Sequence, residues 1–416
     1  MTVRDRRHPP TTSRNQIDRN MFYRGFADET PGVRALKRDA ALDGIRALAA
    51  LGVWLLHVAS NTGVMYGEGM YAWLLSRLGM AVPVFFLLSG LLLYRPWAKA
   101  AIEGAPRPAA GLYLWRRALR VLPVYWLVAS LALWAWTPLD WTGWVVWLLL
   151  LQNYVPGLHS AEGLYQMWTL PIEMAFYLVL PLLGWALHRW AARGGNVPAR
   201  LLWGIAVLPV VSVATVVAAR VLEVPDLALW LPYHLVFFAC GMAMAVLSVW
   251  LGGSRVIGSL APQLLVLAFL LYAVLSTPLA GPRTLTLPTL GESMVRMTLE
   301  AAVAVLLVAP FALAPDPGSL RHRLLGNPVA AYLGRISYSF FLWHAPVITL
   351  HRQITGDPPF TGDFTSLAVV SFIVSLLLSI ASYHLIEHVA LTLGRRRSAP
   401  ARPPEAPAPQ PVAPAA

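Results

Sequence analysis

One apolar segment, residues 42–58, contains three ionisable residues, Asp43, Arg46 and His57. It is long and apolar enough to cross a membrane as a helix. The eleven residues from Arg46 to His57 make three helical turns plus about 20°, so both side chains project from one face, about 16 Å apart along the axis. Ionisable groups at membrane depth are costly and normally face the bundle interior at a functional site. This spacing suits a long ligand with a charged end near Arg46 and a reactive end near His57.

A purely structural interpretation of the same residues stays open. Arg46 would then anchor the helix at the cytoplasmic surface, and His57 would make a hydrogen bond in the protein core. Asp43, which precedes Arg46 on the same segment, is a candidate supporting residue for Arg46 and His57.

Three arginines, Arg116, Arg117 and Arg120, stand at the cytoplasmic entrance of another predicted span. Arg117 and Arg120 share a helix face as an i, i+3 pair. Two neighbouring guanidinium groups can each chelate phosphate oxygens bidentately, which indicates a polyphosphate site. Ordinary anchoring of the span by positive charge explains the same residues equally simply.

Two further ionisable residues, Glu173 and His344, are predicted within membrane spans. Glu173 lies about one turn into a helix that enters from the outer side, where a carboxylate serves either catalysis or a hydrogen bond between helices. His344 is at a depth comparable with that of His57, where a structural and a supporting role are both open. Arg296 and Glu300 are i, i+4 neighbours, and we expect a local ion pair between them.

Composition places these residues in a polytopic membrane protein. Of 416 residues, 57% are hydrophobic and 12% charged, whereas soluble proteins have about 25% charged residues. We predict an all-α integral membrane protein with about ten transmembrane helices, at about 41–60, 73–94, 113–136, 168–187, 199–222, 228–251, 261–277, 293–314, 328–350 and 364–388. The segment 144–154 would rise only about 15 Å as a helix, so we predict a short re-entrant or interfacial helix there.

The distribution of positive charge orients these spans. With the N-terminus inside, all but five of the 32 Lys and Arg fall on the cytoplasmic side, so we predict cytoplasmic N- and C-termini. The five exceptions are Arg77, Arg220, Arg283, Arg296 and Arg352. We predict a polar basic tail over residues 1–40, a membrane domain over 41–390 and a Pro/Ala-rich disordered tail over 391–416. The single cysteine, Cys240, leaves no thiolate cluster, and we expect no metal site.

These motifs, taken in order, resemble the acyltransferase-3 family of integral membrane O-acyltransferases. The resemblance runs from about residue 38 to 390. The matching pieces are Leu42-Asp-Gly-Ile-Arg46 with His57, Val84-Phe-Phe-Leu-Leu-Ser-Gly90, Arg117-Ala-Leu-Arg120, Trp168-Thr-Leu through Glu173 to Pro181, and Ile336-Ser-Tyr-Ser-Phe-Phe-Leu-Trp-His344. The departures are Pro171, Leu91 and the ending Ile386-Glu-His-Val389, which lacks the family's following proline.

The resemblance implies that acyl-CoA, with acetyl-CoA favoured, binds from the cytoplasm as a co-substrate, with no resident cofactor. Its phosphates would lie on Arg117 and Arg120, together with Arg116 and Arg46. Its pantetheine arm would place the thioester near His57, acting as general base or as nucleophile.

The resemblance also implies an acceptor hydroxyl on an extracytoplasmic carbohydrate or glycolipid. It would arrive from the outer side, past Glu173 and the loop 155–167. The expected partners are therefore the lipid bilayer, acyl-CoA and this acceptor, without nucleic acid, in a multi-pass protein of a bacterial plasma membrane.

A transporter or flippase that moves a sugar or lipid without covalent chemistry is the alternative. Buried charges and interrupted helices suit such a protein equally well. The chain shows no evident internal repeat, and Arg46 and His57 share one helix face, so the sequence favours the enzyme.

Overall fold

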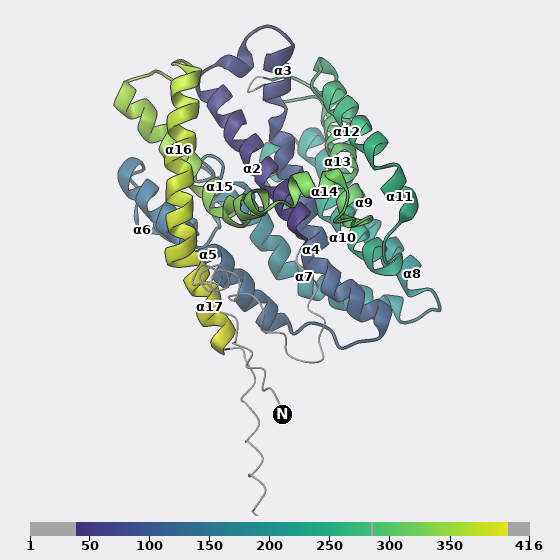
Figure 1. The fold of residues 1–416 in the computed structure, drawn as a ribbon. Coiled ribbons are helices and arrows are strands. Elements are labelled where there is room, and N and C mark those ends of the chain that lie inside the picture. Colours follow the sequence, from purple (N-terminus) through teal and green to yellow (C-terminus); the bar gives the residue numbers. More distant parts are fainter. Residues whose placement is uncertain (1–38, 284–285, 398–416) are drawn as a thin grey trace, which may run out of the picture. The chain divides into compact units, whose positions relative to one another are not determined.

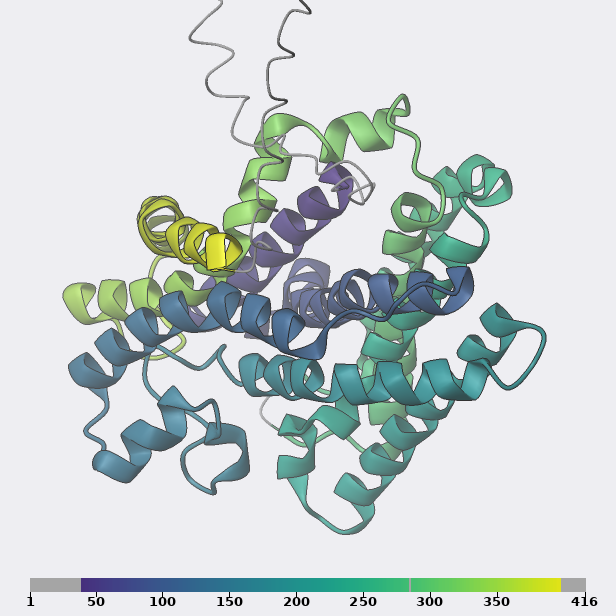
Figure 2. The same cartoon turned by 90° about the horizontal axis from the view of Figure 1, so that it is seen from below.

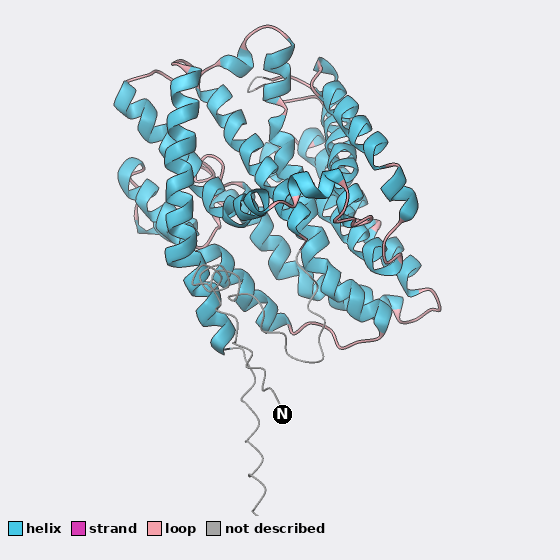
Figure 3. Ribbon diagram, in the orientation of Figure 1, coloured by secondary structure: helices cyan, strands magenta, loops and turns pink. Residues whose placement is uncertain are grey.

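The computed structural model describes residues 39–283 and 286–397, and every regular element in them is a helix (Figures 1 and 3). The prediction of an all-α membrane protein is confirmed. From Ala40 onward the described residues belong to one compact unit. The predicted tail over residues 1–40 falls almost wholly outside the described residues, as does the segment 398–416. The last helix, α17 (His388–Arg397), extends past the predicted start of the C-terminal tail at residue 391.

Eight helical stretches in the described part of the chain are long and apolar enough to cross a membrane. Three of them contain two α-helices each, and a fourth joins the 3-10 helix η5 (Pro225–Leu229) to α10. The eight stretches contain α2 (Ala40–Asn61), α3 with α4 (Met70–Ser76 and Ala81–Glu103), α5 (Ala110–Trp136), α7 (Thr169–Ala191), α8 with α9 (Val197–Ile205 and Val207–Val221), α10 (Leu231–Trp250), α13 (Leu290–Ala312), and α16 (Phe364–Ser382) with α17.

The two remaining predicted spans are also helical but depart from a simple apolar span. α12 (Ala261–Leu275) has 15 residues and rises about 22 Å, less than the roughly 30 Å of a hydrocarbon core. α15 (Pro328–Thr355) has 28 residues, so its length is ample, but it is less apolar than a typical span. Its polar residues include the buried Ser337, Ser339 and His344, which a helix enclosed by other helices can carry.

The short helix predicted at 144–154 is α6 (Trp141–Leu148), followed by the 3-10 turn η4 (Gln152–Tyr154). α6 begins earlier than predicted because the Asp140 side chain accepts a hydrogen bond from the backbone N–H of Gly143 and caps the helix. Eight residues rise about 12 Å, so α6 is too short to cross a membrane. The other short elements are η2 (Val64–Tyr66), η3 (Leu78–Met80), η5 (Pro225–Leu229), α11 (Arg255–Ser259), η6 (Pro278–Ala280), α14 (Leu320–Leu325) and the π-helical turn η7 (Tyr383–Glu387).

Glycines allow the central helices to approach closely. α2 packs against both α15 and α4, and α4 packs against α10 (Figure 1). A Cβ atom on Gly334 of α15 would lie 2.0 Å from the backbone oxygen of Asp43, and one on Gly241 of α10 would lie 1.9 Å from that of Leu87. Small residues at these crossings let the backbones touch. Seen from below, α5 and α7 run next to each other across the base of these helices (Figure 2).

The five arginines predicted on the outer side gather at the end of the bundle where α2 ends. Each donates hydrogen bonds to loops or helix ends there: Arg77 to Gly281, Arg220 to Ser293, Arg283 to Met65 and Gly67, Arg296 to Ala280 and Pro282, and Arg352 to Asn61. The predicted topology places all five of these arginines on one side of the membrane, and their position at one end of the bundle agrees with it. The cytoplasmic placement of both termini stays a prediction.

Candidate active site

His57 lies about one turn before the end of α2 and contacts His344 of α15 directly. The Nδ1 atom of His57 is 2.9 Å from the Nε2 atom of His344. The two rings are stacked, with centroids 5.1 Å apart. His344 is fully buried, whereas His57 is half-buried. The sequence indicated comparable depths for these residues, and the structure joins them in one hydrogen bond.

The hydrogen-bond network assigns the protons of this neutral histidine pair. The Nδ1 atom of His344 is 3.3 Å from the backbone oxygen of Phe340. A carbonyl oxygen only accepts, so Nδ1 of His344 carries a proton and its Nε2 has a lone pair. Nδ1 of His57 must then donate to that lone pair, which leaves the Nε2 atom of His57 unprotonated. A general base or a nucleophile needs this lone pair.

Tyr165 and Asn61 also contact His57, on sides that His344 does not occupy. The Tyr165 ring packs edge-on against the imidazole at a centroid distance of 4.9 Å. Asn61 donates to the backbone oxygen of His57 at 2.8 Å and to the Tyr165 hydroxyl at 3.4 Å, and it accepts from Arg352 at 3.1 Å. Burial raises the pKa of Tyr165, so its hydroxyl keeps its proton at neutral pH. Tyr165 lies in a loop remote in sequence from α2, and the motifs gave no signal for it.

A basic cavity of about 100 Å³ lies among α2, α4, α5, α7 and α15. Arg46, Arg117 and Arg120 all line it. Three of the four arginines predicted to bind a polyphosphate are therefore brought together. Arg116 is exposed and does not line this cavity.

Glu173 of α7 also lines the basic cavity. Its Oε1 atom accepts a hydrogen bond from the Ser89 hydroxyl of α4 at 2.7 Å and another from the Tyr177 hydroxyl. The sequence interpretation placed this carboxylate on an outer path past the loop 155–167. The structure instead places it among the arginines, bound by two hydroxyl donors that the sequence reasoning did not assign.

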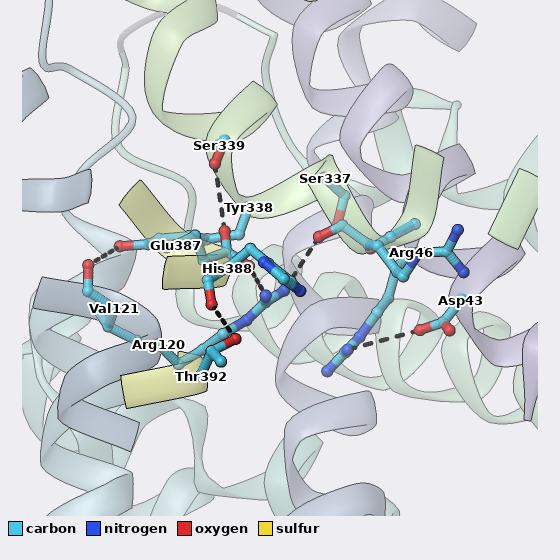
Figure 4. A network of polar contacts seen from close by, with 12 residues as sticks. Asp43, Arg46, Arg120, Val121, Ser337, Tyr338, Ser339, Glu387, His388 and Thr392 are labelled. Carbon is cyan, nitrogen blue, oxygen red and sulfur yellow. Dashed lines mark hydrogen bonds and ion pairs between the residues drawn. The ribbon is translucent and has the colours of Figure 1, made fainter. Parts of the chain in front are cut away.

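Arg120 forms an ion pair with Glu387 and donates to the backbone oxygen of Arg335 at 3.2 Å (Figure 4). Glu387 is fully buried at the end of the π-helical turn η7, and its Oε2 atom accepts from the Ser339 hydroxyl at 3.3 Å. Such turns are frequent at functional sites. Glu387 could have been noticed in the sequence because it is a carboxylate at the inner end of an apolar span. Its partner, Arg120, could not be predicted from the sequence.

Asp43 lies beside Arg46 (Figure 4). The nearest atoms, Nη1 of Arg46 and Oδ1 of Asp43, are 4.0 Å apart. The Asp43 side chain is buried, and that of Arg46 retains a quarter of its exposure. Asp43 therefore supports one of the cavity arginines electrostatically.

The two histidines line neither the basic cavity nor a second, larger cavity, but each contacts a residue that lines one of them. Phe341, which lines the basic cavity, has its ring 5.7 Å from the ring of His344. Tyr165, which contacts His57, lines the second cavity, whose volume is about 620 Å³. A basic pocket, a central imidazole with a lone pair and a separate larger pocket are the parts that a group-transfer enzyme with two substrates requires.

This arrangement defines a multi-pass membrane enzyme. The chain belongs to the acyltransferase-3 family, whose profile, described as "Acyltransferase domain", matches residues 39–384. The protein is thus an acyltransferase, and the family membership decides against the transporter or flippase alternative.

Three relatives cover most of this chain. It is 28% identical to "Acyltransferase MdmB" of Streptomyces mycarofaciens, over 86% of this chain and 93% of that protein. It is 26% identical to "Exopolysaccharide production protein ExoZ" of Rhizobium meliloti (strain 1021), over 82% and 96%. It is 25% identical to "Putative peptidoglycan O-acetyltransferase YrhL" of Bacillus subtilis (strain 168), over 85% of this chain and 55% of that protein. No solved structure matches the chain.

Proposed function

We propose that the protein transfers an acyl group, foremost acetyl, from cytoplasmic acyl-CoA to a hydroxyl of an extracytoplasmic carbohydrate or glycolipid, in a bacterial plasma membrane. The observation that carries this proposal is the pairing of His57 with His344, which leaves a lone pair on Nε2 of His57. The names of two relatives support a carbohydrate acceptor, since one refers to peptidoglycan and the other to exopolysaccharide.

The basic cavity is the proposed site of the donor. Arg46 and Arg117 would bind phosphate oxygens of acyl-CoA, with Arg120 held beside them by Glu387. At about 100 Å³, the cavity has room for about three water molecules. Entry of an acyl-pantetheine arm therefore requires lining side chains to move apart, and Phe341 stands between this cavity and His344.

Two routes use the same lone pair of His57. In direct transfer, Nε2 takes the proton of the acceptor hydroxyl while its oxygen attacks the thioester carbonyl. The new C–O bond forms, the C–S bond breaks, and the CoA thiolate receives the proton. In the covalent route, Nε2 attacks the thioester carbonyl first, the C–S bond breaks and the CoA thiolate leaves. The acceptor oxygen then attacks the acyl-imidazole, the acyl–N bond breaks, and the hydroxyl proton passes to the thiolate. In either route Nε2 of His344 accepts the hydrogen bond from Nδ1–H of His57 and stabilises the positive charge on His57.

Labelled acetyl-CoA supplied to inside-out membrane vesicles tests this function. We expect label in alkali-labile ester linkage on carbohydrate or glycolipid material, and none in vesicles with the His57→Gln variant. Mild alkali should release the label as acetate. Label recovered only as acetyl-CoA and free acetate would exclude the proposed transfer.

Replacing Arg117 with Lys should raise the KM for acetyl-CoA. Lysine keeps the charge but loses the bidentate fork, and each lost contact worth about 1.4 kcal/mol raises the KM about tenfold. Arg116→Lys is the matched control, because Arg116 is exposed and does not line the cavity. Equal KM values for the two variants, measured in detergent-solubilised protein, would contradict donor binding at Arg117.

A further inference from the structure

The second cavity has the size of a small-molecule site. Its volume of about 620 Å³ falls within the range of roughly 300–1,000 Å³ typical of ligand pockets. It lies between the start of α4, the loop before α7, the start of α10 and the first half of α13. None of the predicted site residues lines it, but Tyr165 connects it to His57.

Glu300 supplies the decisive chemistry of this cavity. It stands near the middle of α13, where a charged group faces a cavity or a partner. The predicted ion pair with Arg296 is wrong: Arg296 donates through Nε to Ala280 at 2.9 Å and through Nη2 to Pro282 at 3.2 Å. Among the described residues, no hydrogen bond or ion pair holds the Glu300 carboxylate. Carboxylate oxygens accept hydrogen bonds, so Glu300 suits a ligand that brings hydrogen-bond donors.

Both arginines of the cavity donate to backbone carbonyls, although the buried Nε of Arg77 has no hydrogen-bond partner among the described residues. Arg77 donates to the backbone oxygen of Gly281, and Arg296 donates to the two carbonyl groups named above. An anionic ligand would compete with these carbonyls for the guanidinium groups and would place its charge near Glu300. The cavity therefore favours a neutral ligand rich in hydroxyl groups over an acidic one.

Aromatic side chains form another part of the cavity lining. Tyr165, Trp168, Tyr233 and Phe237 all line it. The negative face of an aromatic ring attracts partially positive C–H groups, such as those on the flat face of a sugar ring. Aromatic side chains can contact the faces of a saturated ring, and a nearby carboxylate can accept hydrogen bonds from hydroxyl groups on the edge of that ring. Together they can recognise a sugar.

We propose that this cavity binds the acyl acceptor as a neutral sugar ring, with Glu300 accepting hydrogen bonds from its hydroxyl groups. This inference rests on the proposed function and specifies the acceptor. Aromatic side chains would contact the ring faces, and Tyr165 would mark the side from which a hydroxyl reaches His57. The outer-end arginines Arg77 and Arg296 would shape the cavity through the loop that they bind.

Binding of neutral methyl glycosides tests the proposal. The probes are the methyl gluco-, galacto-, manno- and rhamnopyranosides, with methyl glucuronide as the anionic comparison, measured by calorimetry on detergent-solubilised protein. We expect at least one neutral glycoside to bind more tightly than the glucuronide. Glu300→Gln should weaken that binding about tenfold or more, since hydrogen bonds to charged groups are worth about 1.5–3 kcal/mol.

Glu68→Gln is the matched control, because Glu68 is exposed and does not line the cavity. Trp168→Leu removes an aromatic wall without a charge, and it provides the test if Glu300→Gln protein does not accumulate. Absence of binding by every neutral glycoside, or unchanged binding in these cavity variants, would overturn the proposal. Acetyl-CoA binding is measured on the same samples and should be unaffected by Glu300→Gln. Its absence in the unmodified protein would count against the proposed donor instead.

Discussion

His57→Gln should lower turnover per folded molecule by at least about 10²- to 10⁴-fold, the usual contribution of a positioned acid or base. Loss of a covalent nucleophile would cost more. Glutamine is close in size and keeps polar atoms that can bond to Nε2 of His344, so the helix contact between α2 and α15 should survive. It has no titratable lone pair, so it can neither take the acceptor proton nor attack the thioester.

The measurement is acetyl transfer per mole of monodisperse protein, with acetyl-CoA binding as a second readout. Donor binding should change little, because the arginines that line the basic cavity are untouched. His388→Gln makes the same replacement at an exposed position and should leave turnover unchanged. A merely structural His57 would reduce the amount of folded protein and leave turnover per folded molecule near that of the unmodified enzyme. That result would move the chemistry to another residue, first to Glu173.

Helical periodicity alone indicated which candidate site residues share a helix face. Arg46 and His57 lie on one helix, as do Arg117 and Arg120, and 3.6 residues per turn fixes which faces they occupy. The structure places Arg46, Arg117 and Arg120 around one cavity. Hydrophobicity and length likewise predicted the helical spans, although α12 is shorter and α15 more polar than a typical span. Enclosure by other helices lets α15 carry buried polar residues.

Contacts between helices could not be predicted from the sequence, because they depend on where the helices cross, which no local pattern encodes. The pairing of His57 with His344 requires α2 and α15 to pack closely, which Gly334 allows. The position of Glu173 was misread because depth along a helix does not specify direction, and its carboxylate turns toward Ser89 of α4.

The pair of Arg296 and Glu300 shows how loops override a local rule. An i, i+4 spacing brings two charges within reach, but such a pair contributes only about 0.2–0.5 kcal/mol on an isolated helix. Backbone carbonyls of Ala280 and Pro282 offer Arg296 two fixed acceptors instead. Within the described part of the chain, Glu300 is thus left without a hydrogen bond or a contact ion pair, and its carboxyl group can serve a ligand in the second cavity.

His344→Phe should lower kcat by roughly 10- to 100-fold while the KM for acetyl-CoA stays nearly constant. The orienting partner of a catalytic histidine keeps it in the reactive tautomer, and losing a carboxylate partner can cost about 10⁴-fold. A neutral imidazole is a weaker acceptor than a carboxylate, so we expect a smaller effect here. Phenylalanine preserves the ring packing against Phe340 and Phe341 but cannot accept the Nδ1 proton of His57.

His344→Gln separates positioning from packing. The side-chain oxygen of glutamine can accept the Nδ1–H of His57, which keeps Nε2 unprotonated. We therefore expect kcat for the Gln variant to recover most of the loss seen with Phe, at equal amounts of folded protein. A packing role predicts the reverse order, since Phe is the better replacement for a buried ring. Turnover of the Phe variant equal to that of the unmodified enzyme would show that His57 needs no partner. Recovery by Gln alone would show that the proton on Nδ1 of His57 is what His344 controls.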